Sequence, residues 1–208
     1  MTFLKRLRGV GDPTHVALTF DDGPDRQATP QLLDLLASRG VTATFFLIGI
    51  QVRDDPGLAK EIAAAGHEIA VHGWEHRCLL YRSPRATHQD IAAAHELIGE
   101  VIGAPLQWYR PPYGVLTWPA YSAARRLGLT PVLWTAWGRD WSARATPTSV
   151  FRTVTRSLRG GGTVLLHDSD RFASPGSWRS MLGAVPLLLD ECERRGLTVG
   201  PLGEHGLV

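Results

Sequence analysis

Short apolar runs alternate along the chain with longer stretches in which apolar residues recur every three or four positions. The short runs are rich in β-branched and aromatic residues, which is typical of buried strands. They span residues 16–20, 44–48, 68–71, 107–110, 130–134, 163–167 and 197–199. The longer stretches have the periodicity of amphipathic helices. They span residues 29–40, 55–66, 87–102, 117–127, 147–158 and 178–195.

Residues that favour helix ends mark the limits of these helical stretches. Thr29 and Pro30 predict a helix start with Thr29 as N-cap, and Asp55 precedes a proline in the same way. Gly40 and Gly128 follow the last periodic residues, where a glycine commonly ends a helix. The pattern therefore predicts separate helices between successive strands.

Strands that alternate with helices predict a largely parallel sheet. About seven strand–helix units favour a (β/α) barrel over an open doubly wound sheet. No Gly-x-Gly-x-x-Gly follows the first strand, which weakens a dinucleotide-binding interpretation. The 208 residues are a suitable length for a single domain. We therefore predict an α/β fold with a barrel of about seven parallel strands in one domain.

Composition and charge exclude several classes of function. With 44% hydrophobic and 20% charged residues, the chain has the balance of an ordinary globular protein. Its formal net charge of +2 is too small to indicate a nucleic-acid partner. No apolar run approaches the roughly 20 residues of a membrane-spanning helix. Cys78 and Cys192 form neither a disulfide framework nor a metal motif, and whether they pair stays open.

Localisation is not readable from the chain. The basic residues near the start, Lys5, Arg6 and Arg8, are not followed by an apolar segment of signal-peptide length. The chain as given therefore suggests a cytoplasmic protein, whereas a truncated sequence would allow a secreted or cell-envelope one. We expect a monomer, although the sequence does not fix the oligomeric state.

Polar residues gather where the predicted strands end. The carboxyl ends of the strands are followed by Asp21 and Asp22, His72, Arg110, Asp140, and His167 with Asp168. In a β/α barrel these ends share one face, which is where such folds carry their active sites. A turn-forming role would explain any one of these residues, but their common placement favours an active site.

Two of these clusters have the residue types of a metal site. His72 and His76 lie four residues apart, which places them on one face of a helical turn and lets both bind one ion. A carboxylate from another strand end would complete an Asp–His–His set with open positions for water and substrate. Oxygen and imidazole ligands suit Zn²⁺ and also Co²⁺, Ni²⁺ or Mn²⁺.

The motifs resemble those of the polysaccharide deacetylases, the NodB-type domain of carbohydrate esterase family four. Residues 19–24 and 110–114 are the most specific, and the motif set extends to Asp168. The resemblance implies a deformed β/α barrel that removes acetyl groups, usually from N-acetylglucosamine units, with the help of a metal. We therefore expect a catalytic domain over residues 15–208, after an N-terminal segment over residues 1–14.

The resemblance also implies a role for individual residues of this chain. Asp22, His72 and His76 would hold the metal, most simply Zn²⁺, with Co²⁺ or Ni²⁺ as alternatives. Asp21 would be the general base and would be oriented by Arg110. His167 would be the general acid, with its properties tuned by Asp140. The expected substrate-binding residues are Pro112, Tyr113, Trp137, Trp141 and Leu165.

The chain departs from the family pattern at two positions. Gly73 stands directly after the first metal histidine, where the family usually has a serine or threonine that braces the loop. Trp137 stands three residues before Asp140, where the family often has Asp or Asn. The first departure puts the geometry of the metal loop in question, and the second the range of substrates.

Two alternatives remain at the level of the sequence. The order His72-Gly73-Trp74-Glu75-His76 also matches the H-x-x-E-H motif of zinc peptidases, in which the glutamate is the general base. That motif belongs on a long helix, whereas here it follows a strand. A carbohydrate-binding homologue without catalysis is the second alternative. The sequence does not show whether the substrate is a chitin oligomer, peptidoglycan, acetylated xylan or a smaller molecule. It also leaves open whether the acetyl group is bound to nitrogen or to oxygen.

Overall fold

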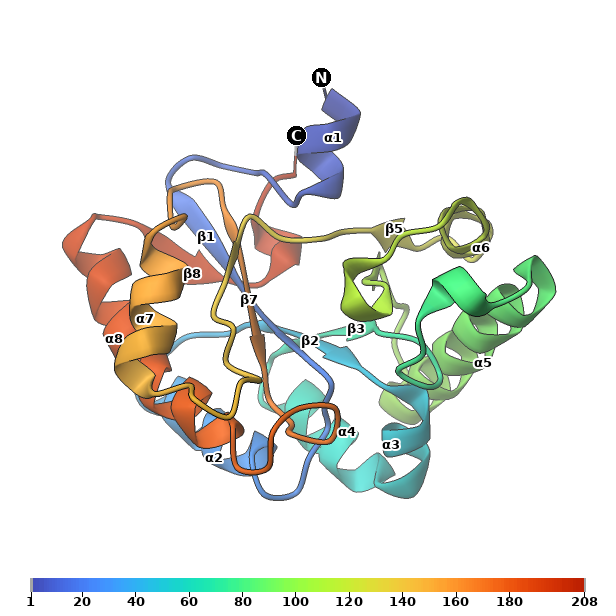
Figure 1. Cartoon of the computed structure of the whole chain (residues 1–208), viewed down its shortest axis with the longest axis horizontal. Helices are drawn as coiled ribbons and strands as arrows, with labels where there is room; N and C mark the ends of the chain where they lie inside the picture. Colours follow the sequence, from blue (N-terminus) through green and yellow to red (C-terminus); the bar gives the residue numbers. More distant parts are fainter. Residues whose placement is uncertain (1, 208) are drawn as a thin grey trace.

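The computed structural model describes residues 2–207 and contains one curved parallel sheet surrounded by helices (Figure 1). The strands are β1 (His15–Asp21), β2 (Thr44–Leu47), β3 (Glu68–Val71), β4 (Trp108–Tyr109), β5 (Thr130–Pro131), β6 (Ala136–Trp137), β7 (Thr163–His167) and β8 (Thr198–Gly200). The α-helices are α1 (Thr2–Leu7), α2 (Thr29–Ser38), α3 (Gly49–Asp54), α4 (Pro56–Ala64), α5 (Pro84–Ile102), α6 (Trp118–Arg126), α7 (Pro147–Thr155) and α8 (Trp178–Arg194).

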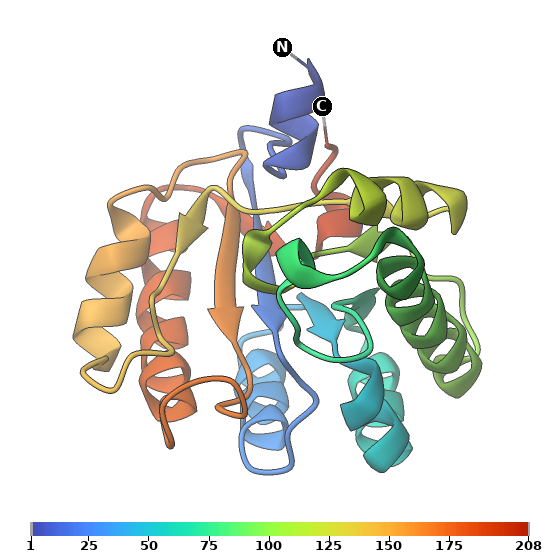
Figure 2. The same ribbon diagram turned by 45° about the vertical axis from the view of Figure 1, so that its right-hand side comes forward.

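The strands run in the order β5-β4-β3-β2-β1-β7-β6, with β8 paired to β1, and every pairing is parallel. Strands β5 and β6 are consecutive in the chain, yet they lie at opposite ends of this path. The sheet is therefore a barrel that does not close between them, which confirms the predicted deformed (β/α) barrel. The helices form an outer ring around the sheet (Figures 1 and 2). This ring runs from α7 and α8 through α2 to α5 and α6.

Strand β1 occupies the centre of the sheet, and all seven of its residues are buried. Its apolar residues Val16, Ala17, Leu18 and Phe20 are typical of a parallel strand covered on both faces. The strand pairs with β7 from Ala17 to Asp21, so that Asp21 lies beside His167 in the register. The backbone pairing alone therefore brings the carboxyl ends of β1 and β7 together.

The structure corrects several predicted elements. The predicted strand over residues 130–134 ends at Pro131, and the chain then forms β6, which pairs with β7 instead. Helices α1 and α3 were not predicted, because six residues are too few to show helical periodicity. Helix α5 begins at Pro84 rather than at residue 87, and Ser83 is its N-cap.

Thr29 is not the N-cap of α2, contrary to the prediction. Ala28 occupies that position, and no side chain caps the helix. The Thr29 hydroxyl instead donates a hydrogen bond of 2.7 Å to Asp168 Oδ2, across to the end of β7. Burial raises the pKa of Asp168 to about 7 despite this hydrogen bond. Thr29 therefore joins α2 to the carboxyl end of the sheet.

The C-terminal segment closes the amino end of the sheet. The 3₁₀ helix η3 (Leu202–Glu204) lies against the first residues of β2 and β3. Leu202 N donates to Thr44 Oγ1 at 2.8 Å, and Thr44 Oγ1 donates to Glu68 at 2.6 Å. Trp108 Nε1 donates to the other oxygen of Glu68 at 2.7 Å. We call Thr44, Glu68, Trp108 and Leu202 the closing cluster.

Candidate active site

Strand β1 ends in two adjacent carboxylates whose side chains have different neighbours. Asp21 Oδ1 accepts a hydrogen bond from Arg110 Nη1 at 2.6 Å. Asp22 has a positive φ of 77°, and its Oδ1 lies 3.4 Å from His72 Nε2 and 3.3 Å from His76 Nε2. Both carboxylates are buried. The left-handed conformation at Asp22 thus separates the two acids and limits the repulsion that a carboxylate doublet would otherwise suffer.

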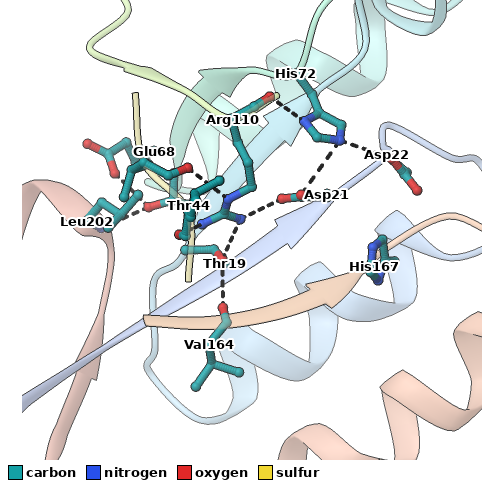
Figure 3. Close-up of polar contacts among 12 residues, drawn as sticks. Thr19, Asp21, Asp22, Thr44, Glu68, His72, Arg110, Val164, His167 and Leu202 are labelled. Atoms are coloured by element: carbon teal, nitrogen blue, oxygen red, sulfur yellow. Dashed lines mark hydrogen bonds and ion pairs between the residues drawn. The ribbon is translucent and has the colours of Figure 1, made fainter. Parts of the chain in front are cut away.

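Arg110 crosses the sheet from the end of β4 to the end of β1 (Figure 3). The side chain is fully buried, with 0% exposure, and its guanidinium also donates to Thr19 Oγ1 at 2.8 Å and to the Leu133 carbonyl at 2.9 Å. It lies 4.0 Å above the ring of Phe46. These contacts leave Arg110 no freedom to move, so its positive charge stays fixed beside Asp21.

His72 follows β3, and both of its ring nitrogens have defined neighbours. Nδ1 donates to the carbonyl of Arg110 at 2.7 Å, since a carbonyl can only accept. This hydrogen bond fixes the tautomer and directs Nε2 towards Asp21 and Asp22, at 3.6 and 3.4 Å. Burial would lower the pKa of His72, but the charges of the two carboxylates raise it.

The segment from His72 to His76 is a loop, so the prediction of a helical turn is wrong. Its backbone carbonyls at Gly73 and Trp74 accept hydrogen bonds from the first residues of α3, Gly49 N and Ile50 N, at 2.9 and 3.1 Å. The two histidine rings nevertheless approach to 5.2 Å between centroids. A short helix that sequence periodicity could not reveal therefore shapes this loop.

The local structure explains why residue 73 is a glycine in this chain. Its φ is +98°, and a Cβ at this position would lie 2.8 Å from Asp90 Oδ2. Asp90 comes from α5, where it accepts a hydrogen bond of 2.9 Å from Trp74 N and pairs with Arg82 Nη1 at 3.0 Å. The loop lacks the hydroxyl usual in the family, but a carboxylate from the neighbouring helix braces it.

Asp22, His72 and His76 form a set that fits a divalent cation. One potential ligand atom from each lies within 4.8 Å of the others. Asp22 Oδ1 and His76 Nδ1 are buried, yet neither has a hydrogen-bond partner in the described part of the chain. Buried polar atoms are rarely left in this state without a ligand or an ordered water. Two imidazoles and one carboxylate are also a donor set that Zn²⁺ and related ions accept.

Electrostatics favours the protonation states that ligation needs at two of these residues. Burial alone would raise the pKa of Asp22, but the adjacent His72, His167 and His76 lower it to about 2. Burial lowers the pKa of His76 to about 4, despite the opposing charge of Asp22. At neutral pH Asp22 is therefore ionised and His76 is neutral.

His167 and Asp140 form a second polar pair on the opposite side of the pocket. His167 Nδ1 lies 3.1 Å from Asp140 Oδ1, and the His167 backbone N–H donates to Asp140 Oδ2 at 2.7 Å. Burial would lower the pKa of His167, but Asp140 and the charges of Asp22 and Asp21 raise it to about 10. Since Asp140 holds Nδ1, Nε2 is the position that can exchange a proton with a bound molecule.

One pocket of about 230 Å³ is lined by Asp21, Asp22, His72, His76 and His167. Arg110 and Asp140 are not among its lining residues. Tyr113, Trp137, Trp141 and Leu165 also line it, in agreement with their expected positions. Pro112, which was also expected to bind substrate, is buried and does not line the pocket. The edge of the Trp141 ring faces His167 at 5.4 Å between centroids.

Three lining residues were not found from the sequence: Gly114, Trp134 and Phe172. Trp134 ends the predicted strand over residues 130–134, and Phe172 lies in a segment without periodicity. The ring of Phe172 stacks on His76 at 4.5 Å, and Tyr113 contacts the same imidazole at 4.3 Å. Only its place shortly after His167 could have pointed to Phe172.

A family model described as polysaccharide deacetylase matches residues 8–132. The chain belongs to the polysaccharide deacetylase family. The prediction of a polysaccharide deacetylase enzyme is thereby confirmed. The matched region contains the doublet, the two histidines and Arg110, whereas Asp140 and His167 lie beyond it. In the structure, β7 carries His167 back to the centre of the sheet, next to β1.

Characterised relatives align with most of this deacetylase. A chitooligosaccharide deacetylase from Bradyrhizobium sp. (strain ANU 289) is 35% identical over 94% of this chain and 93% of the relative. A peptidoglycan-N-acetylglucosamine deacetylase from Bacillus cereus is also 35% identical, over 87% of this chain and 83% of the relative. A mutant of BA3943, a family-four pseudoenzyme with restored activity, superposes with a TM-score of 0.84 at 26% identity, covering 92% of this chain and 67% of the other.

Proposed function

We propose that this deacetylase hydrolyses N-acetyl groups of N-acetylglucosamine-containing carbohydrate, with a divalent cation held by Asp22, His72 and His76. One observation carries the proposal. An Asp–His–His set, in which the buried Asp22 Oδ1 has no hydrogen-bond partner in the described residues, opens into the same pocket as an arginine-held carboxylate and a carboxylate-held histidine. These are the parts that metal-assisted hydrolysis of an amide requires.

Asp21 is the general base of the proposed reaction. Its Oδ1 is held by Arg110, and its other oxygen lies 3.6 Å from His72 Nε2, at the edge of the ligand set. The fixed guanidinium holds the Asp21 carboxylate in one orientation. Asp21 can therefore take a proton from a water molecule that attacks the acetyl carbonyl.

The negative charge that develops on the carbonyl oxygen needs donors. The Tyr113 backbone N–H, in the first turn of the 3₁₀ helix η2 (Pro112–Gly114), is the proposed donor from this chain. Tyr113 has a φ of 59°, so the chain bends sharply beside the pocket. One such donor contributes about 3 kcal/mol to stabilising the transition state.

His167 is the proposed general acid. Its raised pKa means that it carries a proton at neutral pH, and Asp140 leaves Nε2 as the donating atom. Donation to the nitrogen of the tetrahedral intermediate lets the amine leave as acetate is released. Leu165 and Trp141, which line the pocket beside His167, would enclose the acetyl methyl group.

A divalent cation supplies Lewis acidity, which polarises a carbonyl and acidifies water. Zn²⁺ is the ion that we propose, with Co²⁺ or Ni²⁺ as substitutes, because the donor set is two imidazoles and one carboxylate. Every residue in the proposed mechanism comes from one chain, so a monomer is sufficient. Within the described residues, no helix is both long and apolar enough to cross a bilayer.

The structure provides arguments against both alternatives. Glu75 would be the base of an H-x-x-E-H peptidase, but it lies in a loop and pairs with Arg77 rather than lining the pocket. A homologue without catalysis would be expected to have lost part of the machinery. Here each proposed ligand, base and acid is in place around one pocket.

Acetate release after metal-free preparation tests the proposal. The substrates are N-acetylglucosamine oligomers, peptidoglycan and acetylated xylan, each with Zn²⁺, Co²⁺ or Ni²⁺ added back. We expect the metal-free protein to be inactive and activity to return at one ion per chain. Acetate release that is insensitive to chelation would refute the metal site, and no release from any N-acetylated substrate would refute the reaction.

A further inference from the structure

A second groove lies outside the active site, between α5 and α6. Its volume is about 580 Å³. The α5 residues Pro84, Arg85, His88 and Gln89 line one side, and Trp118, Pro119, Ser122, Ala123 and Arg126 of α6 line the other. None of these residues takes part in the proposed mechanism. Figure 2 shows the two helices next to each other on the outer surface of the barrel.

Trp118 is the most unusual residue of this groove. It begins α6, and 77% of its surface is exposed. The indole stacks on Tyr121, one turn later, with 5.6 Å between ring centroids and 22° between ring planes. The stacking holds the exposed ring in one orientation, as a flat apolar surface. Such surfaces bind the apolar faces of sugar rings, and an exposed apolar patch generally indicates an interaction site.

The charges around Trp118 are all of one sign. Arg85 and Arg126 are exposed, and no acidic residue lines the groove. Neither arginine forms an ion pair with any residue in the range 5–207. By contrast, Arg194 and Arg195 on α8 both pair with Glu191. The two groove arginines are therefore available for the carboxylates of a ligand.

The groove lies close to the active site along the chain. Gly114 lines the catalytic pocket, and Trp118 follows it by four residues, so their Cα atoms are separated by at most roughly 14 Å. Helix α5 contributes to both places, since Asp90 from this helix braces the backbone of the metal loop at Trp74. A chain of sugars in the catalytic pocket can therefore extend into the groove.

We infer that the groove between α5 and α6 binds a distal part of an anionic, carboxylate-bearing glycan whose acetylated unit occupies the active site. This inference rests on the proposed function. A sugar ring stacks on Trp118, and carboxylates of the glycan bind Arg85 and Arg126. A neutral glycan makes only the stacking contact with Trp118. The formal net charge of +2 is too small to favour a nucleic-acid backbone as the ligand.

The test compares three acetylated substrates of known charge: N-acetylglucosamine tetramer, neutral glycol chitin and anionic carboxymethyl chitin. The Arg85→Glu/Arg126→Glu variant should raise the KM for carboxymethyl chitin about tenfold, which corresponds to about 1.4 kcal/mol. The KM for glycol chitin and the tetramer should change less than about twofold. Trp118→Ala should raise the KM for both polymers about fivefold and leave that of the tetramer unchanged.

The matched control is Arg152→Glu/Arg156→Glu, which makes the same change of charge at two exposed arginines of the α7 region. It should leave all three KM values unchanged. The inference is overturned if the control raises the KM for carboxymethyl chitin as much as the groove variant does. It is also overturned if the groove variant impairs the tetramer equally, or if a single-stranded oligonucleotide binds the groove more tightly than carboxymethyl chitin.

Failure of the proposed function would look different. In that case no variant or wild-type protein would release acetate from the tetramer. Calorimetric binding of carboxymethyl chitin to the wild-type protein and to the Arg85→Glu/Arg126→Glu variant would then still test the groove. A loss of affinity of about tenfold in the variant supports the groove, and equal affinity refutes it.

Discussion

Two carboxylates at opposite ends of the parallel sheet, Glu68 and Asp22, differ in how their oxygens are satisfied. At the amino end, the closing cluster gives Glu68 partners on both oxygens: Thr44 Oγ1 on one and Trp108 Nε1 on the other. At the carboxyl end, Asp22 is buried more deeply than the half-buried Glu68, yet its Oδ1 has no hydrogen-bond partner in residues 5–207. Figure 3 shows both groups in one view.

This difference separates polar residues that stabilise the fold from those that serve a ligand. A carboxylate whose oxygens are hydrogen-bonded contributes to the stability of the fold. Its removal leaves the donor groups without an acceptor, which lowers the free energy of unfolding. A buried carboxylate without partners costs stability unless something external completes it. Of these two carboxylates, Asp22 is therefore the one whose environment indicates a ligand.

The largest effect is expected where the unpartnered atom is removed. Asp22→Ala deletes one ligand of the proposed cation site. It breaks no hydrogen bond of Asp22 Oδ1, because that atom has no partner in the described residues. We expect loss of bound Zn²⁺ and a fall in kcat/KM of about a thousandfold or more, because Lewis-acid catalysis is worth several kcal/mol. Metal analysis of the purified variant and acetate release measure both. Full metal content with full activity would show that Asp22 is only structural.

His167→Ala should have the next largest effect. General acid catalysis contributes roughly a hundredfold to ten-thousandfold, so kcat should fall within that range while bound metal is retained. The measurements are acetate release and metal content at pH 7. Unchanged turnover would remove His167 from the mechanism.

The His167–Asp140 pair also predicts a pH dependence of stability. The folded-state pKa of about 10 lies above the ordinary 6.5 of histidine. The pair therefore stabilises the folded protein fully below pH 6.5, and this contribution is lost as the pH rises through 10. Urea unfolding of the metal-free protein across that window should show the loss. The Asp140→Asn variant should show much less of it; an equal loss in both proteins would contradict the assignment.

A substitution at the amino end should reverse the pattern. Glu68→Gln disrupts the closing cluster, because an amide cannot accept on both sides as the carboxylate does. The free energy of unfolding should fall by about 1–3 kcal/mol, while kcat and metal content stay the same. Urea unfolding and acetate release at 25 °C test this. A loss of activity without a loss of stability would break the comparison between the two ends.

The smallest effect is expected at Glu75, which lies beside the metal loop but pairs with Arg77 at the surface. Glu75→Gln should change kcat/KM by less than about twofold, since surface ion pairs are worth about 0–1 kcal/mol. A peptidase that used Glu75 as its base would instead be inactivated. Assays on N-acetylglucosamine oligomers and on a peptide substrate distinguish these outcomes.

The sequence predicted the central part of the fold and site well, for physical reasons. Strands β1, β2, β3 and β7 are long enough for an apolar run to identify them, and they carry or adjoin Asp21 and His167. Short elements were missed: α3 has six residues and β6 only two. Their positions depend on tertiary hydrogen bonds, which leave no periodicity in the sequence.

The same limit explains the errors at the site. His72 and His76 were expected on a helical turn, because spacing is the only cue available in a sequence. Their loop conformation depends on Asp90, which is 14 residues further along the chain, and on Gly49 of the missed helix. Contacts between segments of this kind also explain why Phe172, which stacks on His76, was not found.

The central claim is that the doublet divides into a metal ligand and a general base. Asp21→Asn tests it most directly, because the amide keeps the shape of the side chain but cannot accept a proton as a carboxylate does. With Zn²⁺ content confirmed at one ion per chain, acetate release from N-acetylglucosamine oligomers should fall roughly a hundredfold to ten-thousandfold. Wild-type turnover with full metal content, or loss of the metal itself, would contradict the account.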